Sequence, residues 1–137
     1  WKQRVGQAYL TSGVRHQWVK STYETTVANP NITKGTQLWY TPEHQLAGSI
    51  SYRRPQWQLN YQQQWTDSTN GINDDLAAYS LANIKGEWKL GKQLQMTLYG
   101  QCNNLWNTQY RVIERRPMPG RSFRVGLTFT ISKGNNN

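Results

Sequence analysis

The sequence is poor in the residues that build disulfides, metal clusters and membrane helices. Cys102 is the single cysteine in 137 residues, which excludes an internal disulfide and offers no cysteine cluster to a metal. No apolar run reaches the roughly 18 residues that a transmembrane helix requires. Apolar residues make up only 36% of the chain, which is little for a domain that must fill its own interior.

Groups for catalysis are also scarce. The two histidines, His16 and His44, have no cysteine, aspartate or serine at a suggestive spacing, so we predict no enzyme, no catalytic residue, no cofactor and no metal. Acidic residues number 7 against 16 basic ones, which gives a net charge of +9. The basic residues are scattered, and their two short pairs lie beside prolines, so binding of nucleic acid is not predicted.

Tryptophan and tyrosine, in contrast, are abundant, with seven and eight residues against two phenylalanines. Both side chains combine an apolar body with a polar tip, so they suit boundaries better than dry cores. This composition favours a protein whose apolar residues point outward in a thin band.

Strict alternation of apolar residues predicts strands. In residues 121–131 the apolar side chains occupy every second position: Phe123, Val125, Leu127, Phe129 and Ile131. This pattern indicates a strand whose two faces meet different surroundings, and its length is about that of a strand crossing a bilayer. The same alternation predicts strands at residues 46–53, 57–65, 79–88 and 93–102, and two further strands with a mixed pattern and a weakly defined register are predicted at residues 4–11 and 14–27.

The connections between these strands alternate in length. Short turns are predicted at Ser12-Gly13, Arg54-Pro55 and Gly91, and long polar loops at residues 29–43, 67–75 and 103–120. Antiparallel membrane barrels show this asymmetry, with short turns on one side and long loops on the other.

The strand at residues 57–65 is the most informative. Its apolar face is interrupted only by Gln63, and its other face carries only amides. Trp57, beside Tyr52 across a turn, predicts one aromatic girdle, and Trp65, about 20 Å further along the membrane normal, predicts the other. A soluble β-sandwich would show the same apolar alternation, but a run of Gln and Asn suits a wet lumen better than a soluble surface.

Three segments resemble elements of one family. Asn104-Leu105-Trp106-Asn107 with Tyr110 is similar to the "NLF(D/N)xxY" element that opens the last extracellular loop of TonB-dependent outer-membrane receptors. Pro117-Met118-Pro119-Gly120-Arg121 with Phe123 resembles the "PxPGRxF" entry to their final strand, and Pro42-Glu43-His44 resembles their "PxH" segment.

The final strand also resembles the β-signal that the outer-membrane assembly machinery reads, through Arg124, Gly126, Phe129 and Ile131. Family members usually end on the last hydrophobic residue of this signal, whereas this chain continues to Asn137.

The resemblance implies an all-β fold: about seven C-terminal antiparallel strands of a 22-stranded transmembrane β-barrel with a plugged lumen. Residues 1–132 would form this part of the barrel, and residues 133–137 a polar C-terminal tail. Because so few strands cannot close such a barrel, and because the chain begins at Trp1 rather than Met, we expect a processed or partial product, the C-terminal third of a larger receptor.

The resemblance also implies a function and a place. The receptor would lie in the outer membrane of a Gram-negative bacterium and take up a scarce bulky nutrient such as a ferric siderophore, cobalamin or haem. Its partners would be the plug and upstream strands of the same receptor, the TonB complex acting through the missing N-terminal part, outer-membrane lipid, and in some cases a surface lipoprotein. A plug-less outer-membrane porin or adhesin fragment and a soluble sugar-binding β-sandwich are the alternatives.

Candidate site residues follow from these expectations. Four aromatic residues of the long loops are candidate substrate contacts, with girdle or loop packing as the alternative role: Trp39, Tyr40, Trp106 and Tyr110. For His44 we expect a structural polar contact, with a haem ligand as the alternative. The acidic loop at residues 67–75 either is solvated or holds calcium through its Asp and Asn oxygens. Cys102 is expected to face lipid as a small hydrophobic residue.

Overall fold

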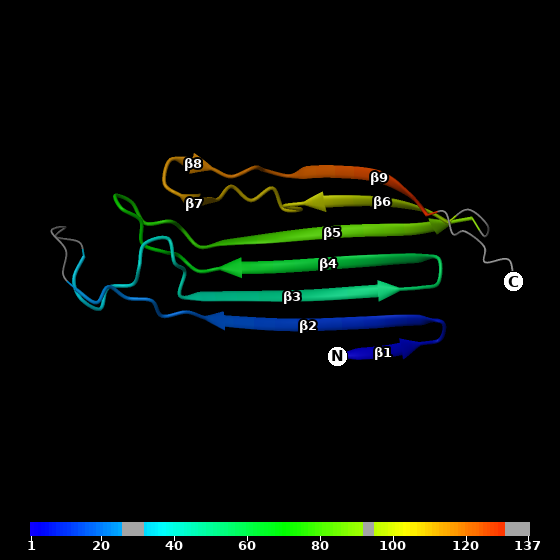
Figure 1. The fold of residues 1–137 in the computed structure, drawn as a ribbon, viewed down its shortest axis with the longest axis horizontal. Coiled ribbons are helices and arrows are strands. Elements are labelled where there is room, and N and C mark those ends of the chain that lie inside the picture. The colour runs from blue at the N-terminus through cyan, green and yellow to red at the C-terminus, as the bar shows by residue number, and fades with distance from the viewer. Residues whose placement is uncertain (26–31, 92–94, 131–137) are drawn as a thin grey trace, which may run out of the picture.

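The computed structural model describes residues 1–25, 32–91 and 95–130, and within them the chain is all-β without a helix. The described residues therefore include no helix that could cross a membrane. The strands, in chain order, are β1 (Lys2–Val5), β2 (Ala8–Trp18), β3 (His44–Arg53), β4 (Trp57–Thr66), β5 (Tyr79–Leu90), β6 (Gln95–Asn103), β7 (Arg111–Ile113), β8 (Arg116–Pro117) and β9 (Ser122–Thr130) (Figure 1).

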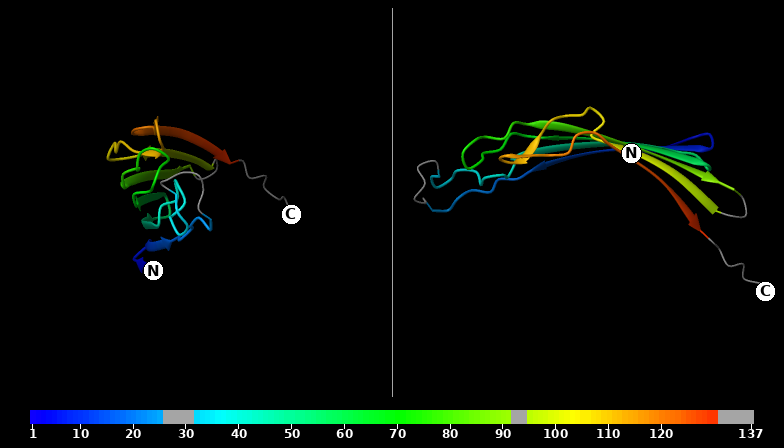
Figure 2. Two further views of the ribbon diagram at one scale, coloured as in Figure 1. Left: turned by 90° about the vertical axis from the view of Figure 1, so that its left-hand side faces the viewer. Right: turned by 90° about the horizontal axis from the view of Figure 1, so that it is seen from above.

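Seven of these strands form one antiparallel sheet in the order β1-β2-β3-β4-β5-β6-β9. The strands β7 and β8 make a separate two-stranded hairpin inside the last long connection. The sheet is open, because β1 and β9 lie at its two edges and each pairs on one side only within the described residues. Figure 2 shows that the sheet curves and twists as a single layer.

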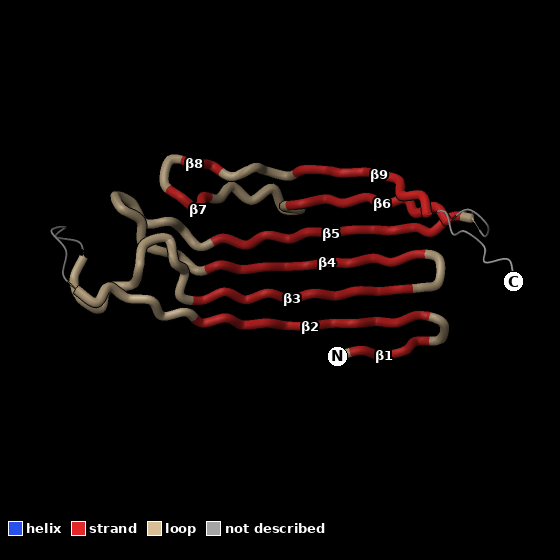
Figure 3. Tube along the Cα trace, in the orientation of Figure 1, coloured by secondary structure: helices blue, strands red, loops and turns tan. Residues whose placement is uncertain are grey.

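Long and short connections lie at opposite ends of the sheet. The described parts of the long connections, at residues 19–25, 32–43, 67–78 and 104–121, gather at one end, whereas the turns at residues 6–7 and 54–56 lie at the other (Figure 3). β5 also ends, and β6 also begins, at this second end; residues 92–94 between them fall outside the described residues. The predicted alternation of connection lengths is therefore confirmed.

The prediction for the first hairpin was wrong. Ser12 and Gly13 do not form a turn but lie within β2, where they pair with Ile50 and Ser49 of β3. The chain reverses earlier, at Gly6, whose φ of 61° is a left-handed conformation that glycine adopts without strain. The second strand also ends at Trp18 instead of continuing through residue 27, which lies outside the described residues.

Later strands agree with the predicted ones to within a few residues. The last strand is Ser122–Thr130 against a predicted 121–131, and Ile131 lies outside the described residues, as does the tail at 133–137. The predicted loop at residues 103–120 contains the β7–β8 hairpin, which the sequence pattern did not indicate.

The sheet has little interior of its own. Among the described residues the buried apolar side chains are Ala8, Ile32, Leu76, Ala82 and Cys102, and most of these are small. Leu76 lies in a loop, where it pairs with Thr69. No second layer of the described chain covers either face, so the sheet is stabilised mainly by its strand pairing and by contacts along its surface.

Candidate functional site

The pairing register divides the sheet into two chemically different faces. Opposed residues of neighbouring strands share a face, and the register aligns Leu46 with Trp65, Ile50 with Tyr61 and Leu98 with Leu127. We call this the apolar face; its large side chains are Leu10, Val14, Trp18, Leu46, Ile50, Tyr52, Trp57, Leu59, Tyr61, Trp65, Ile84, Trp88, Leu90, Met96, Leu98, Phe123, Val125, Leu127 and Phe129.

The apolar face is exposed. Val14 is 81% accessible, Phe123 74%, Val125 76% and Trp88 56%, and Leu59, Leu98 and Leu127 are also exposed. Soluble monomers rarely show a continuous apolar surface of more than a few hundred Å². The surface therefore requires a covering that the described chain does not supply.

Aromatic residues lie at both ends of the apolar face. At the short-turn end the ring of Tyr52 packs on that of Trp57 at a centroid distance of 5.1 Å, and Trp57 pairs with Trp88. At the long-loop end Trp65 lies near the end of β4, and the indole N–H of Trp18 donates to Glu43 at 3.0 Å. The predicted positions of Tyr52, Trp57 and Trp65 thus match the strand ends, while their role as a girdle stays a prediction.

Gln63, the only polar interruption predicted on this face of β4, uses both ends of its side-chain amide in hydrogen bonds. Its Oε1 accepts from the hydroxyl of Tyr61 at 2.6 Å and from the indole N–H of Trp106 at 3.3 Å, and its Nε2 donates to the hydroxyl of Ser80. The cluster gives both the oxygen and the nitrogen of this amide a partner among the apolar side chains. It also places Trp106 against the apolar face.

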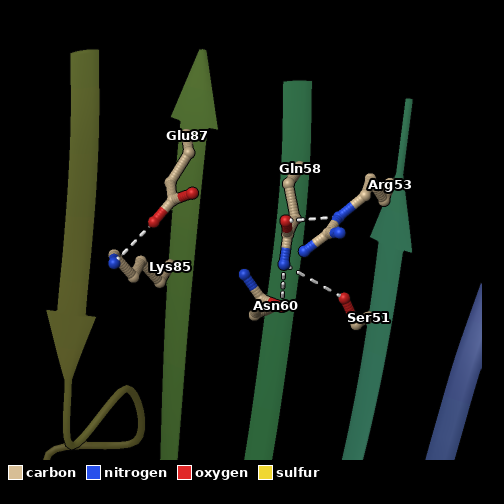
Figure 4. A network of polar contacts seen from close by, with 6 residues as sticks. All are labelled: Ser51, Arg53, Gln58, Asn60, Lys85 and Glu87. Atoms are coloured by element: carbon tan, nitrogen blue, oxygen red, sulfur yellow. Dashed lines mark hydrogen bonds and ion pairs between the residues drawn. The ribbon is translucent and has the colours of Figure 1, made fainter. Parts of the chain in front are cut away.

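The opposite face, here the polar face, carries side-chain amides and charges joined in a network (Figure 4). Gln58 accepts from the guanidinium of Arg53 at 2.8 Å and donates to Asn60 at 2.8 Å and to Ser51 at 3.4 Å. On β5, Lys85 and Glu87 form an ion pair at 2.6 Å. Groups that bond one another along exposed strands suit a hydrated surface, as the predicted lumen would be.

Gly126, a residue of the predicted assembly signal, lies on the polar face, where steric contact explains why a glycine is needed. A Cβ at Gly126 would lie 2.5 Å from the hydroxyl of Tyr99, so the Tyr99 ring occupies the space over Gly126. Lys85 lies 5.5 Å from the centroid of the same ring. Arg124 also lies on the polar face, and Phe129 on the apolar face opposite Met96. The assembly role of these residues stays a prediction, and Ile131 lies outside the described residues.

The two segments of the last loop that carry the resemblance bind each other. The side chain of Asn104 accepts from the N–H of Thr108 at 2.9 Å and donates to the carbonyls of Thr108 and Pro119 at 2.9 and 3.4 Å. Asn107 accepts from the N–H of Arg121 at 2.9 Å. Both asparagines have positive φ, of 50° and 55°, which this residue type tolerates better than most. The loop therefore returns to the sheet through side-chain amides.

The four candidate substrate contacts do not come together in one site. Trp39 packs edge-on against Tyr23, and the N–H of Tyr40 donates to Asn70. Trp106 is 60% exposed and bonds Gln63 on the apolar face. Tyr110 stacks on Tyr79 at 4.7 Å and lines a hollow at the long-loop end, together with Ala77, Ala78, Gln109, Arg111 and Pro117. Tyr79, on which Tyr110 packs, lies on the polar face of the sheet.

The acidic loop is organised around a carboxylate that the sequence did not single out. Glu114, between β7 and β8, accepts from the N–H of Asn73 at 2.7 Å, from its side-chain amide at 2.9 Å and from the N–H of Asp74 at 3.1 Å. These bonds, the Asn73 side chain first, lower the pKa of Glu114 to about 2. Asn73 thus donates to an anion here, and among the described residues no group of acidic, His and Cys side chains is arranged around a common metal position. We call this contact the Glu114 clamp.

The two histidines lie side by side at the long-loop end of β2 and β3. Nε2 of His16 is 3.3 Å from Nδ1 of His44, and the rings stack at a centroid distance of 5.4 Å. His44 therefore makes the structural polar contact that we expected; its alternative role as a haem ligand is not tested.

Sequence reasoning missed the Gln63 cluster, the Glu114 clamp and the packing of Tyr99 on Gly126. For Gln63 the signal was present, because a single amide within an apolar face indicates a local partner. For Glu114 there was none, because its partners are about 40 residues away in another loop.

A scan against protein-family models found no match to this chain, and a search among curated proteins found none either.

Proposed function

We propose that this chain is the C-terminal part of the β-barrel of a TonB-dependent outer-membrane transporter, which takes up a scarce bulky nutrient such as a ferric siderophore, cobalamin or haem. One observation carries the proposal: a single curved antiparallel sheet exposes large apolar side chains on one face and bonded amides on the other. Hydrocarbon outside and water inside is the environment that fits both faces.

The dimensions of the strands support a membrane location. β4 has 10 residues, or roughly 33 Å at about 3.3 Å per residue, and a tilt of about 40° reduces this to about 25 Å. That height equals the apolar band of outer-membrane barrels. The aromatic rings of Tyr52 and Trp57 at one end and of Trp65 at the other lie where such a band meets the headgroups.

The open edges support a larger barrel. In hydrocarbon an unpaired strand edge leaves backbone N–H and C=O groups without partners, each costing several kcal/mol. The edges at β1 and β9 would therefore pair with further strands of the same receptor, as in a 22-stranded barrel. The family's plug and its contact with TonB belong to the part upstream, so this segment would serve as wall and loop.

A plug-less porin or adhesin would use the same sheet, and an upstream plug would separate the two. The third candidate, a soluble sugar-binding β-sandwich, requires a second sheet over Trp57, Leu59, Leu98 and Leu127. These four side chains are exposed, which favours the membrane proposals.

The complete protein offers a direct test. We expect it to fractionate with outer membranes and to support uptake of one of the three nutrient classes only when the TonB complex is intact. Uptake of a small solute without TonB would indicate the porin instead. Recovery in the soluble fraction as a monomer would overturn the proposal.

A further inference from the structure

The polar face carries all the formal charge of the seven-stranded sheet. Among its described strand residues, no Lys, Arg, Asp or Glu lies on the apolar face. Glu87 is the only acidic strand residue on the polar face, and it is paired with Lys85 at 2.6 Å. The basic residues of this face are Lys2, Arg4, Arg15, Arg53, Lys85, Lys89 and Arg124. A face with this balance attracts anions.

One hollow on the polar face lies at the short-turn end, across β1, β2 and β3. Its lining consists of Lys2, Tyr9, Thr11, Ser51 and Arg53, and its volume is about 620 Å³, within the range of roughly 300–1,000 Å³ that ligand pockets occupy. The register places all five on the polar face, because Lys2 pairs with Thr11, Thr11 with Ser51, and Tyr9 with Arg53. The two cations therefore lie on either side of β2, with their backbones roughly 10 Å apart across the sheet.

Both cations are held by neutral neighbours. The Nζ of Lys2 lies 4.9 Å from the centroid of the Tyr9 ring, and the Nε of Arg53 donates to Oε1 of Gln58 at 2.8 Å (Figure 4). Neither cation forms an ion pair within the described residues. In the register Glu87 is separated from Arg53 by Gln58, and its carboxylate is paired with Lys85. The hollow thus has two positioned cations and no acidic residue in its lining.

The remaining lining groups favour an oxyanion over other ligands. The hydroxyl of Ser51 accepts from Nε2 of Gln58 at 3.4 Å, so its own O–H remains available to donate, and the Thr11 hydroxyl supplies a second O–H. Ammonium, guanidinium and hydroxyl donors together match the oxygens of a phosphate or carboxylate. A neutral sugar would stack on the ring of Tyr9, but Lys2 already lies over that ring.

We infer that this hollow binds the phosphate or carboxylate group of a small anionic solute, through Lys2, Arg53 and the two hydroxyls. Binding needs only water on the polar face. The place of the hollow in a transport path rests on the proposed function, in which the short turns lie at the periplasmic end of the lumen. An anionic nutrient would then meet this site as it leaves the barrel.

The test uses the complete protein, purified in detergent, with pyrophosphate as the anionic probe and isothermal titration calorimetry as the measurement. At about 0.15 M salt, charges more than about 8 Å away are largely screened. We expect the protein to bind pyrophosphate and not to bind spermidine or glucose at the same concentration. Lys2→Gln and Arg53→Gln should each weaken the affinity for pyrophosphate by roughly twofold to fivefold, and the double variant by roughly tenfold.

Arg15→Gln is the matched control, because Arg15 lies on the same face of β2, roughly 20 Å along the strand from Tyr9. It should leave the affinity for pyrophosphate unchanged. The charge-reversed variant Lys2→Glu with Arg53→Glu should lose pyrophosphate and bind spermidine instead, which an unfolded protein would not do.

Absence of pyrophosphate binding by the wild type would overturn the inference. An equal loss of affinity in Arg15→Gln would do the same, since it would show a diffuse charge effect without a site. Insertion into the outer membrane without anion binding rejects this inference alone. Pyrophosphate binding by a protein that does not reach the outer membrane supports the hollow and rejects the proposed function.

Discussion

Gln63 shows how a single polar side chain is accommodated on the apolar face. It holds the hydroxyl of Tyr61, the hydroxyl of Ser80 and the indole N–H of Trp106 at one point. Two of these partners belong to the neighbouring strand and to a loop, so the amide joins β4, β5 and the last long loop. The residue is therefore structural, and the loop position of Trp106 depends on it.

Replacement of this amide has a measurable cost. We expect Gln63→Leu to lower the free energy of unfolding by about 1–3 kcal/mol, because it leaves three polar groups without their partner. Unfolding by urea in detergent micelles measures the change. Gln62→Leu, on the polar face, should change it by less than about 0.5 kcal/mol. Equal effects of the two variants would show that the Gln63 bonds contribute nothing.

Tyr99 and Gly126 make a second prediction at this scale. We expect Gly126→Ala to cost about 1–3 kcal/mol of stability, because its new methyl group forces the Tyr99 ring to move. In Tyr99→Ala the same change should cost much less, so the double variant should be more stable than the sum of the two single effects predicts. Gly100→Ala, whose methyl group meets open space, is the control. Strict additivity would contradict the steric explanation.

At the scale of elements, strands with strict alternation were predictable and the first hairpin was not. In the strands after residue 46 the apolar residues occupy every second position. The strands and the face to which each side chain belongs can therefore be predicted from the alternation of side chains in a pleated strand. Before that, the apolar residues do not alternate regularly, and Ser12-Gly13 has the composition of a turn although both residues pair within β2. The contacts of Gln63 with Trp106 and of Glu114 with Asn73 join segments about 40 residues apart, so these partners could not be identified from a local pattern.

The two faces can be distinguished by one charge placed on each. We expect Ile50→Arg to destabilise the protein by about 2–4 kcal/mol in a bilayer, because Ile50 lies near the middle of the apolar face. Gln62→Arg, at an adjacent level on the polar face, should be nearly neutral. Unfolding of both variants in lipid vesicles measures the difference. A neutral Ile50→Arg would mean that water, not hydrocarbon, meets this face.

The Glu114 clamp predicts how two loops respond to pH. Since the pKa is about 2 in the folded protein and about 4.3 in an unfolded chain, the clamp stabilises the loops fully above pH 4.3 and weakens as pH falls toward 2. The amide protons of Asn73 and Asp74 should thus be protected equally at pH 7 and pH 5, and less protected near pH 2.5. Glu114→Gln should remove this pH dependence, and Glu24→Gln should not. Loss of protection between pH 7 and pH 5 would contradict the assignment.

At the scale of the molecule, the seven strands present more apolar surface than water tolerates and two edges that invite pairing. We expect the isolated chain of residues 1–137 to aggregate in buffer without detergent and to remain dispersed with it. Analytical ultracentrifugation in the two conditions measures this. A stable monomer without detergent would show that the apolar face is covered in some other way and would favour the sandwich.

The order of the sheet has a consequence for how such a protein is made. From β1 to β6 every strand pairs with the one synthesised just before it, and only β9 reaches its neighbour across an intervening hairpin. Pairing two strands that follow each other in the sequence costs less loop-closure entropy than pairing distant ones. The sheet can therefore grow by one strand at a time. In the proposed barrel, closure would then be the slow step, because the free edge of β9 would have to pair with a strand far upstream in the chain.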